Sequence, residues 1–253
     1  MDWDACLASA PPAPLAGILL RMVESQEQVA TNQLVSGLKR QAVLEDLLEA
    51  NKPPNRAGAA RLHYLLATPF RYPPLKWGSR FGRRNEPSLF YGSLDITTLL
   101  CEAAYYRFVF WSGMSFPPRR KLDTQHMMLS ASYQSDFGMR LQDPPFDHYR
   151  RMLAHPSDYA ASQELGTRMR TAGIEAFEFV SARNPDGGIN VALFTPAAFS
   201  SPAPLALDAW LCETMAEKVS FRAVHRREAR DGWTTHDFPR SLFQVAGSLP
   251  LPA

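Results

Sequence analysis

Apolar residues recur at helical spacing through most of the first 56 residues of the chain. The run begins at Ala16, and its apolar members are Ile18, Leu19, Met22, Val23, Leu34, Val35, Leu38, Val43, Leu44, Leu47 and Leu48. Lys52 is followed by two prolines, which end a helix because proline lacks an N–H group and disfavours helix in the residue before it. The pattern predicts a helical N-terminal extension over residues 1–56, either packed on the main domain or used for dimerisation or partner binding.

A mixture of strand and helix patterns follows up to residue 200. Short apolar runs predict strands over residues 88–93, 121–132, 174–180 and 189–194. Helical spacing predicts helices over residues 96–110 and 157–172, and Gly173 is a common stop for the second helix. The turn sequence Asn184-Pro-Asp-Gly-Gly separates the last two strands, so these strands form a hairpin or lie side by side.

The C-terminal stretch starts with a proline-rich connector after residue 200. Its pattern predicts a helix or turn over residues 205–215, a strand over residues 219–224 and a turn at Arg230-Asp-Gly. The proline-containing tail beyond Phe243 is expected to be loose. The whole pattern predicts an α+β domain over residues 57–243, preceded by the helical extension and followed by a tail over residues 244–253.

The composition is that of a soluble globular protein. The chain has 253 residues, 45% of them hydrophobic and 21% charged, which is enough for one substantial core. A net charge of +2 is too small to argue for nucleic acid. The basic residues are nevertheless clustered, which suits a small phosphorylated ligand, a polymer or a solvated surface. The three clusters are Arg71, Lys76, Arg80, Arg83 and Arg84; Arg119, Arg120 and Lys121; and His225, Arg226, Arg227 and Arg230.

The cysteines and the N-terminal residues indicate a reducing compartment. Cys6, Cys101 and Cys212 lie far apart and are odd in number, which argues against a disulfide framework or a cysteine zinc site. Asp2 and Asp4 stand where a secretory signal would carry basic residues. No apolar run approaches the ~20 residues that a membrane span needs. We therefore expect a cytoplasmic protein.

Several common chemistries lack their sequence motifs. The chain has no phosphate-binding GxxxxGK loop, no GxGxxG, no HExxH and no GxSxG. Its six histidines show no metal-ligand spacing, and Asp147-His148 with His155 is more simply interpreted as surface. We predict no metal site, and the residue types left to carry chemistry are arginine, tyrosine, glutamate and serine.

These residue types form an ordered set in the mixed region. The set is Arg71, Gly78-Ser-Arg80-Phe, Tyr91-Gly-Ser, Leu-Cys-Glu102 and Phe-Val-Ser181-Ala-Arg183. This order resembles the RES-domain family, which is named for its arginine, glutamate and serine, over roughly residues 60–200. Residues 41–54 and 62–74 also resemble a longer subgroup of that family.

The resemblance carries expectations about fold, activity and partners. Members of the family are typically toxins of bacterial toxin–antitoxin pairs. They consume NAD+ by hydrolysis or phosphorolysis of the nicotinamide–ribose bond, or they transfer ADP-ribose to a protein. The resemblance implies an ADP-ribosyltransferase-like α+β fold, in which helices flank a mixed, split β-sheet. It also implies an oligomeric complex with a helix-turn-helix antitoxin that inserts a segment into the active site, without direct contact to nucleic acid or a membrane.

Glu102 is the acid in the ordered set that suits this chemistry. It stands in the apolar run of residues 99–104, where a solvated helix-surface glutamate is the alternative interpretation. Cleavage of the nicotinamide–ribose bond builds positive charge on the ribose, as in glycoside hydrolysis. A carboxylate accelerates that step if it stabilises the transition state more than bound NAD+. We predict that Glu102 faces an arginine-lined cleft and lies within reach of Tyr91 and Arg80.

The other members of the set are assigned by what NAD+ would require. Arg71 and Arg80 would bind the diphosphate, because guanidinium groups bind phosphate oxygens bidentately; a surface basic cluster is the alternative. Where the family usually has Gly-Arg-Trp-Asn, this chain has Ser79-Arg80-Phe81-Gly82 followed by two more arginines, so it stays open whether Arg80, Arg83 or Arg84 meets the phosphate.

Tyr91 and Ser181 would contact the nicotinamide ribose. A core aromatic and a strand end are their alternative interpretations, and no histidine base beside Ser181 makes it a nucleophile. Arg183 and Asn190 complete the predicted NAD+-binding set, unless they are only an ion-pair partner and a polar strand residue. The predicted catalytic residues are Glu102, Arg80, Tyr91 and Ser181.

Three hypotheses about function therefore stand together. The first is an NAD+-degrading toxin, and the second is an ADP-ribosyltransferase that modifies a protein target with the same residues. The third is a non-enzymatic module in which basic residues hold a nucleotide or nucleic acid. Only charge clustering supports the third hypothesis, and the small net charge weakens it.

Overall fold

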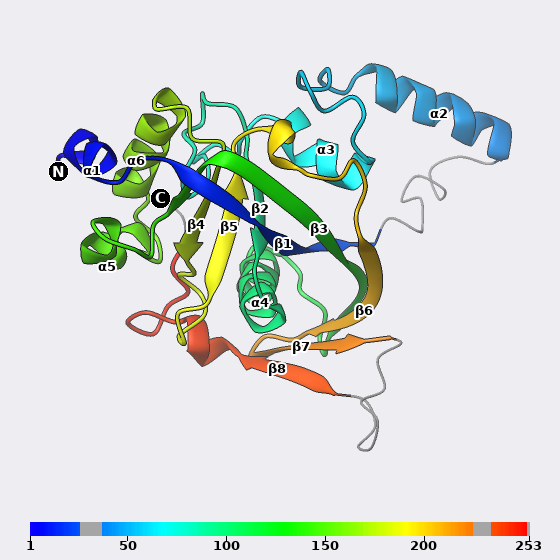
Figure 1. Cartoon of the computed structure of the whole chain (residues 1–253). Helices are drawn as coiled ribbons and strands as arrows, with labels where there is room; N and C mark the ends of the chain where they lie inside the picture. The colour runs from blue at the N-terminus through cyan, green and yellow to red at the C-terminus, as the bar shows by residue number, and fades with distance from the viewer. Residues whose placement is uncertain (26–36, 225–233, 252–253) are drawn as a thin grey trace.

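The computed structural model describes residues 1–25, 37–224 and 234–251 and shows an α+β fold (Figure 1). The helices are α1 (Trp3–Ser9), α2 (Leu38–Ala50), α3 (Tyr64–Arg71), α4 (Ile96–Ser112), α5 (Arg150–Leu153) and α6 (Ala160–Thr171), with 3₁₀ turns η2 (Phe146–Tyr149), η3 (Pro196–Ala198) and η4 (Arg240–Phe243). The strands are β1 (Ala13–Glu24), β2 (Phe90–Ser93), β3 (Leu122–Arg140), β4 (Ala176–Val180), β5 (Ile189–Leu193), β6 (Ala206–Thr214), β7 (Lys218–Ala223) and β8 (Thr235–Pro239).

All eight of these strands belong to one mixed sheet, in the order β1-β2-β5-β4-β3-β6-β7-β8. The β3–β4 pair is parallel, whereas the other pairs are antiparallel. Because β1 also pairs with β3, the strands β1, β2, β5, β4 and β3 close into a ring. The long strand β3 also belongs to the half of the sheet outside this ring, where its residues 122–130 pair with β6. The predicted α+β class, with a mixed sheet flanked by helices, is confirmed.

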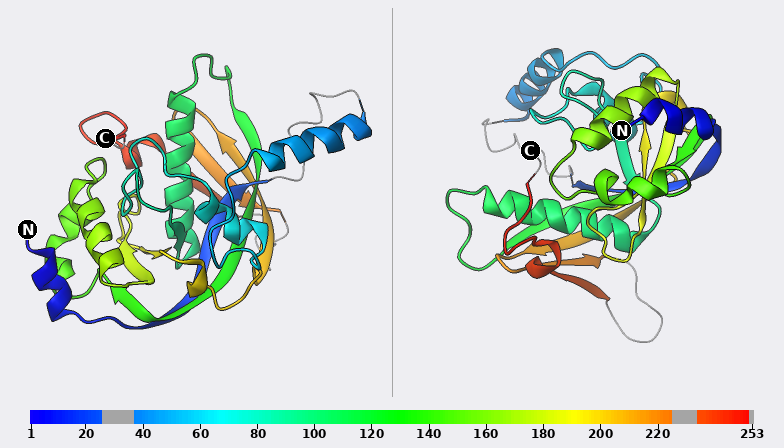
Figure 2. Two further views of the ribbon diagram at one scale, coloured as in Figure 1. Left: turned by 90° about the horizontal axis from the view of Figure 1, so that it is seen from above. Right: turned by 90° about the vertical axis from the view of Figure 1, so that its left-hand side faces the viewer.

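The sheet curves around α4, the longest helix of the described residues (Figures 1 and 2). Leu100, Ala104 and Phe108 of α4 are completely buried and pack with side chains of β6, β7 and β8 in one hydrophobic cluster. Helices α1, α5 and α6 lie together at one end of the molecule, and α2 and α3 lie at another (Figure 1). Burial of its apolar face fixes α4 against the sheet and therefore fixes the direction of its polar side chains.

The helix predicted from Ala16 to Val23 is wrong, because this segment is part of β1. Residues of β1 pair with β3 in one long antiparallel ladder that runs from Ala13 opposite Gly138 to Glu24 opposite His126. A continuous apolar run fits a strand as well as a helix, and only the partner strand decides between them. Ile18, which the helical pattern placed among the apolar positions, is 54% exposed. Residues 38–50 form the predicted helix, so the extension is only partly helical.

The helix or turn predicted over residues 205–215 is also wrong, because β6 occupies residues 206–214. Trp210, Cys212 and Thr214 are buried on the side of α4, whereas Leu211 is 36% exposed. This alternation has the two-residue period of a strand. Pairing with both β3 and β7 supplies the backbone hydrogen bonds that a helix would have made internally.

Most other element predictions are confirmed. The predicted helices around Glu102 and before Gly173 are α4 and α6, and Gly173 has the left-handed backbone conformation (φ +77°) of a helix stop. The two strands around the Asn184 turn are the antiparallel neighbours β4 and β5. Strand β3 extends eight residues beyond the predicted end at Ser132.

The tail after Phe243, which the sequence predicted to be loose, makes contacts within the described residues. Leu249 packs on the cluster around α4, and the Tyr105 hydroxyl donates a hydrogen bond to the Pro250 carbonyl. The predicted turn at Arg230, the third basic cluster and the apolar positions Leu34 and Val35 lie outside the described residues. No helix in the described parts of the chain has the length and apolar character needed to cross a membrane.

Candidate active site

Glu102 lies on the second turn of α4, whose start is fixed by an aspartate cap. One carboxylate oxygen of Asp95 accepts a hydrogen bond from the Thr98 amide at 2.8 Å, and the other accepts one from the Thr98 hydroxyl at 2.6 Å. Such an N-cap satisfies a backbone donor that the helix cannot satisfy itself. The Thr98 hydroxyl in turn accepts a hydrogen bond from the Asn184 side chain at 3.0 Å. The start of α4 is thereby joined to the turn between β4 and β5.

The Glu102 carboxylate is held through one oxygen only. Its Oε1 accepts hydrogen bonds from the Ser181 hydroxyl at 2.6 Å and from the Asn190 amide at 2.7 Å. Ser181 follows β4, and Asn190 lies in β5, so three elements converge on this oxygen. No described residue donates a hydrogen bond to Oε2 of Glu102. The carboxylate is half-buried, and its second oxygen is left for a ligand.

Ser181 and Asn190 are themselves fixed by buried hydrogen bonds. The Ser181 oxygen accepts hydrogen bonds from the backbone amides of Arg183 at 3.0 Å and Asn184 at 3.1 Å. The Ser93 hydroxyl, at the end of β2, donates to the Asn190 side-chain oxygen at 2.7 Å, which directs the Asn190 NH₂ group toward Glu102. The turn is tight here: a Cβ on Gly188 would lie 1.8 Å from the Thr98 hydroxyl oxygen.

Arg80 and Arg183 lie against a common tyrosine, Tyr159. The guanidinium carbon of Arg80 is 4.5 Å from the centre of the Tyr159 ring, and its Nη1 donates to the carbonyls of Leu153 and His155. Arg183 Nη2 donates to the Pro156 carbonyl at 2.7 Å and to the Tyr159 hydroxyl at 3.4 Å.

The Arg183 guanidinium carbon also lies 3.4 Å from the centre of the Tyr105 ring. Neither Arg80 nor Arg183 forms an ion pair with an acidic side chain of the described residues. Carbonyl dipoles and ring faces hold both cations without neutralising them.

Tyr106 joins the two arginines electrostatically to Glu102, one helical turn before it. Burial raises the pKa of the Tyr106 hydroxyl, Tyr159 and Glu102 raise it further, and Arg183 and Arg80 lower it. Tyr106 is nevertheless 54% exposed, whereas Arg183 lies against Tyr105 and its backbone amide donates to Ser181, the partner of Glu102. The carboxylate and both guanidinium groups therefore share one neighbourhood.

One comparison with known proteins identifies the family of this chain. The model of the family described as RES domain matches residues 53–215, which is more than half of the chain. The chain belongs to the RES-domain family. Family membership indicates an enzymatic activity related to NAD in general. No curated protein matches the sequence.

The RES-domain tyrosine, Tyr91, supports the arginine segment and makes no hydrogen bond to Glu102 among the described residues. Its hydroxyl accepts a hydrogen bond from the Phe81 amide at 3.1 Å and lies 3.0 Å from the Ser79 hydroxyl oxygen. Burial raises the pKa of Tyr91, and the nearby Arg170 and Arg80 lower it. The structure thus places Tyr91 where it positions the loop that carries Arg80, and its predicted contact with the nicotinamide ribose stays a prediction.

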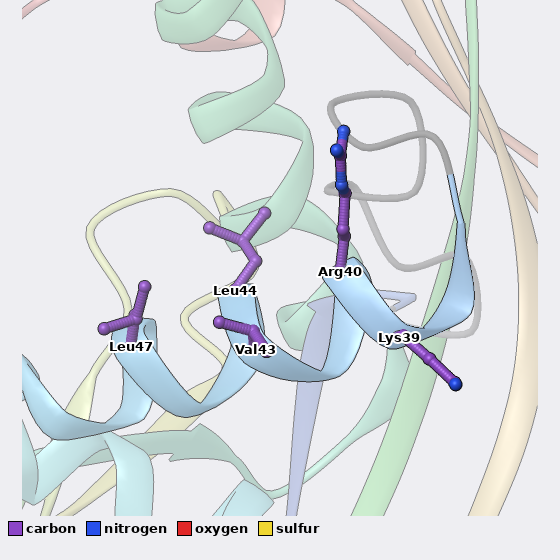
Figure 3. A pocket seen from close by; sticks show the side chains of 5 residues that line it. All are labelled: Lys39, Arg40, Val43, Leu44 and Leu47. Carbon is purple, nitrogen blue, oxygen red and sulfur yellow. The ribbon is translucent and has the colours of Figure 1, made fainter.

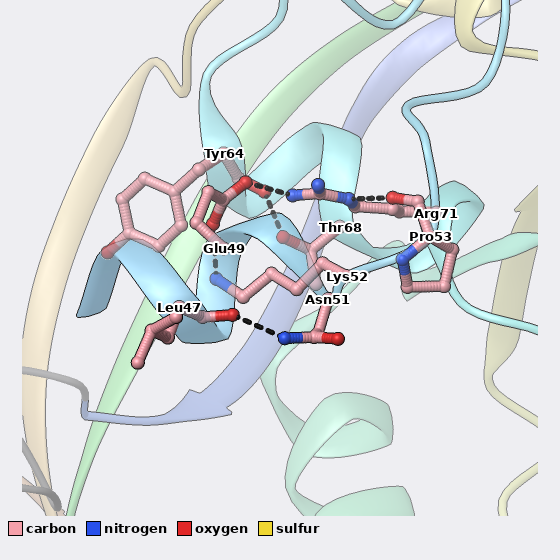
Figure 4. A network of polar contacts seen from close by, with 8 residues as sticks. All are labelled: Leu47, Glu49, Asn51, Lys52, Pro53, Tyr64, Thr68 and Arg71. Carbon is pink, nitrogen blue, oxygen red and sulfur yellow. Dashed lines mark hydrogen bonds and ion pairs between the residues drawn. The ribbon is translucent and has the colours of Figure 1, made fainter. Parts of the chain in front are cut away.

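Arg71 lies in a different network of the RES domain (Figure 4). At the end of α3, its Nη1 donates to Glu49 of α2 at 2.7 Å, and its Nε donates to the Pro53 carbonyl. Glu49 also pairs with Lys52 at 2.6 Å. The structure therefore shows Arg71 holding α2 against α3, and its predicted contact with the diphosphate has no support in this geometry. Arg83 and Arg84 are exposed.

Glu178 shows how a structural carboxylate of this fold differs from Glu102. It is 6% exposed, and both of its oxygens have partners: the Tyr133 hydroxyl at 3.0 Å and the Gln142 amide at 2.8 Å. Arg140 lies 3.4 Å from the second oxygen. Glu178 therefore has no oxygen without a partner, in contrast to Glu102.

Cys101, the neighbour of Glu102, is a neutral thiol in this site. Burial raises the pKa of Cys101 to about 12, and Glu102, Asp186 and Asp95 contribute in the same direction. A thiol with such a pKa provides almost no thiolate near neutral pH, and thiolate is the nucleophilic form. The chemistry of the site therefore depends on the carboxylate and the guanidinium groups.

Two surface hollows lie away from Glu102. One follows α2 and is lined by Lys39, Arg40, Val43, Leu44 and Leu47 (Figure 3). The other is lined by polar residues of β3, β6, β7 and β8. Within the described residues, no group of three or more His, Cys, Asp or Glu side chains is arranged to hold a metal ion. The candidate site is therefore defined by its hydrogen bonds and charges.

Sequence reasoning missed several residues that build the site. Ser93 belongs to the quoted Tyr91-Gly-Ser segment, yet its role in orienting Asn190 follows only from the β2–β5 pairing. Tyr105 and Tyr106 follow Glu102 by three and four positions, so helical spacing could have indicated that they lie beside it. Nothing in the sequence pointed to Tyr159.

Proposed function

We propose that this RES-domain protein consumes NAD+ by cleaving the bond between nicotinamide and ribose. The observation that carries the proposal is the Glu102 carboxylate, which two buried side chains hold through Oε1 while Oε2 has no described partner. A carboxylate fixed in this way is preorganised for positive charge that develops on a substrate. Its hydrogen bonds need no rearrangement during the reaction, which is what makes electrostatic stabilisation effective.

Glu102 is proposed to stabilise the ribosyl cation. As the bond from ribose to nicotinamide breaks, nicotinamide leaves with the bonding electron pair and the ribose carbon becomes electron-deficient. The positive charge of the nicotinamide ring is lost at the same time, so attraction by the carboxylate shifts toward the ribose. This attraction grows along the reaction and therefore lowers the barrier.

Arg80 and Arg183 are proposed to bind the diphosphate of NAD+. In the described hydrogen bonds, Arg80 uses only Nη1, and the Arg183 guanidinium uses only Nη2. Each guanidinium therefore keeps further N–H donors for phosphate oxygens, in the fork geometry that suits them. Stacking on Tyr159 and Tyr105 holds both groups before the ligand arrives, which lowers the entropic cost of binding.

Ser181 is proposed to position Glu102 rather than to act as a nucleophile. Its proton is donated to Glu102, and its oxygen accepts two backbone amides at 3.0 and 3.1 Å. Those two hydrogen bonds occupy the lone pairs that an attack on the ribose would need. Asn190 is assigned the same positioning role from the other side.

We further propose, on family membership, that the protein is the toxin of a cytoplasmic toxin–antitoxin pair. Its partner would be a helix-turn-helix antitoxin that inserts a segment into the site around Glu102. Transfer of ADP-ribose to a protein would use the same residues and is the alternative outcome of the experiment below.

The experiment is to incubate the purified chain with NAD+ and to measure free nicotinamide, with and without phosphate. A parallel reaction contains cell extract and NAD+ labelled in its adenine. Nicotinamide release without labelled protein supports NAD+ cleavage, and its dependence on phosphate separates phosphorolysis from hydrolysis. Labelled protein bands would instead support ADP-ribosyl transfer. No loss of NAD+ in any reaction would refute both.

A further inference from the structure

Helix α2 lies at the edge of the molecule, away from the candidate active site (Figure 1). Its attachment to the rest of the chain is polar. Glu49 pairs with Arg71 at the end of α3 (Figure 4), and Gln41 is buried and donates to Glu45 of the same helix. Gln41, Glu45 and Glu49 are spaced by four residues, so they share one face of the helix.

The opposite face of α2 is exposed and largely apolar, with Arg40 at its N-terminal end. Val43 and Leu47 are 58% and 57% exposed, and with Leu44 they form a stripe along the hollow of Figure 3. A surface helix of a globular protein usually has the reverse arrangement, with its apolar stripe toward the core. An apolar face that points outward on a helix with a polar inner face indicates an interaction surface.

The charges beside this stripe identify the partner. Lys39 lies near the N-terminal end of α2 and Asp46 in its second half, and neither forms an ion pair with a described residue. They are seven positions apart, so they lie within about 20° of each other around the helix, on one edge of the stripe. No acidic residue occupies the first turn and no basic residue the last turn, the reverse of what the helix dipole favours.

We propose that α2 is a homodimerisation helix that pairs antiparallel with α2 of a second copy. A two-fold axis near residues 42 and 43 would bring Lys39 of each copy beside Asp46 of the partner subunit, on the same edge of the interface. The two stripes formed by Val43, Leu44 and Leu47 would pack against each other. Such self-complementarity is what a two-fold interface requires, and a basic first half with an acidic second half provides it.

The dimer formed by α2 alone is weak. Thirteen residues of helix extend over about 20 Å, so two such helices bury much less than the ~1,600 Å² of a standard stable interface. Monomers and dimers should therefore exchange, with a midpoint that depends on protein concentration. The proposal is independent of the proposed NAD+ chemistry, because Glu102 is not part of this face.

The test is sedimentation velocity of the full chain over a wide range of concentrations. Glutamine is compatible with a helix, so the double variant Val43→Gln with Leu47→Gln should keep α2 intact. It should remain monomeric at every concentration tested. The matched control changes two similarly exposed leucines elsewhere, Leu205 and Leu207 of 52% and 47% exposure, to glutamine and should dimerise like the wild type. Circular dichroism checks that the helix content is unchanged.

Charge reversal then distinguishes the antiparallel pairing from other contacts. Lys39→Asp alone and Asp46→Lys alone should each weaken the dimer about tenfold, because each change places like charges together twice. An equimolar mixture of the two variants should recover dimerisation, since every contact in the mixed dimer then joins opposite charges. A wild type that stays monomeric, or a mixture that dimerises no better than either variant alone, would overturn the proposal.

Discussion

The substitution Glu102→Gln tests the central chemical argument, because the structure predicts what the new amide will do. Ser181 and Asn190 both donate to Oε1, so the glutamine oxygen takes that position and keeps both hydrogen bonds. The NH₂ group must then replace Oε2, the atom without a described partner. The atom that faces the ligand changes from a negatively charged acceptor to a donor with partial positive charge, while the side chain keeps its shape.

The expected loss is in turnover rather than in folding. Removing one preorganised electrostatic group from a site of this kind typically costs ~3–4 kcal/mol in the transition state, a decrease of about 10²–10³-fold in kcat. The two retained hydrogen bonds then have a neutral amide oxygen as acceptor instead of a carboxylate. This should lower the free energy of unfolding by only about 1–2 kcal/mol. For a domain of this size, that shifts Tm by at most ~8 °C.

Glu178→Gln is the matched control, because it makes the same chemical change at a carboxylate that is buried. Glutamine is neutral, so this change removes the ion pair with Arg140 and weakens the hydrogen bonds from Tyr133 and Gln142. Hydrogen bonds to a charged group contribute about 1.5–3 kcal/mol and neutral ones about 0.5–1.5 kcal/mol, so a loss of about 1–3 kcal/mol is expected. We expect a lower Tm with nearly normal turnover per folded molecule, the opposite of Glu102→Gln.

The assay measures nicotinamide release by liquid chromatography and Tm by differential scanning fluorimetry on the same preparations. Growth inhibition on induction of each variant provides a second readout in cells. If Glu102→Gln retains turnover within about threefold of the wild type, it would lose far less than the 10²–10³-fold of a preorganised group, and the assigned role of Glu102 would be wrong.

Three other changes test the surrounding groups. Arg80→Lys should raise KM for NAD+ about tenfold or more at similar Tm, because lysine cannot provide a planar fork stacked on Tyr159; an unchanged KM would contradict diphosphate binding. Ser181→Ala should lower kcat, and it should lower the free energy of unfolding by ~2 kcal/mol or more because two backbone amides lose their acceptor; chemical denaturation measures this loss. Burial lowers the pKa of His126 to about 4, so stability present above pH 6.5 is lost as pH falls toward 4, by roughly 3 kcal/mol. His126→Gln should flatten that loss in urea denaturation, whereas His148→Gln, at an exposed position, should not.

Local sequence signals were sufficient where an element carries its own pattern. The helix around Glu102 has an aspartate cap and a long apolar run, and turn-forming residues separate the two strands on either side of Asn184. Of the predicted site residues, the structure joins Glu102, Ser181 and Asn190 by hydrogen bonds. Their catalytic and binding roles stay predictions.

Long-range pairing decided the elements that the sequence pattern misassigned. Residues 13–24 and 206–214 contain apolar runs that suit either a helix or a strand, and β3 pairs with both segments. Backbone hydrogen bonds between distant segments leave no periodic pattern in the sequence, so local patterns do not predict them. The same applies to Arg71, whose ordered place in the sequence suggested a ligand although Glu49 and Pro53 are its partners.

The sequence by itself therefore determined the class of fold, the helix that carries Glu102 and the kinds of residue available for chemistry. Only the tertiary structure decided that Oε1 of Glu102 is held by Ser181 and Asn190 while Oε2 is free of described partners. The physical reason is direction: residue spacing determines which face of an element a side chain occupies, whereas packing of separate elements determines which single atom it presents to a ligand.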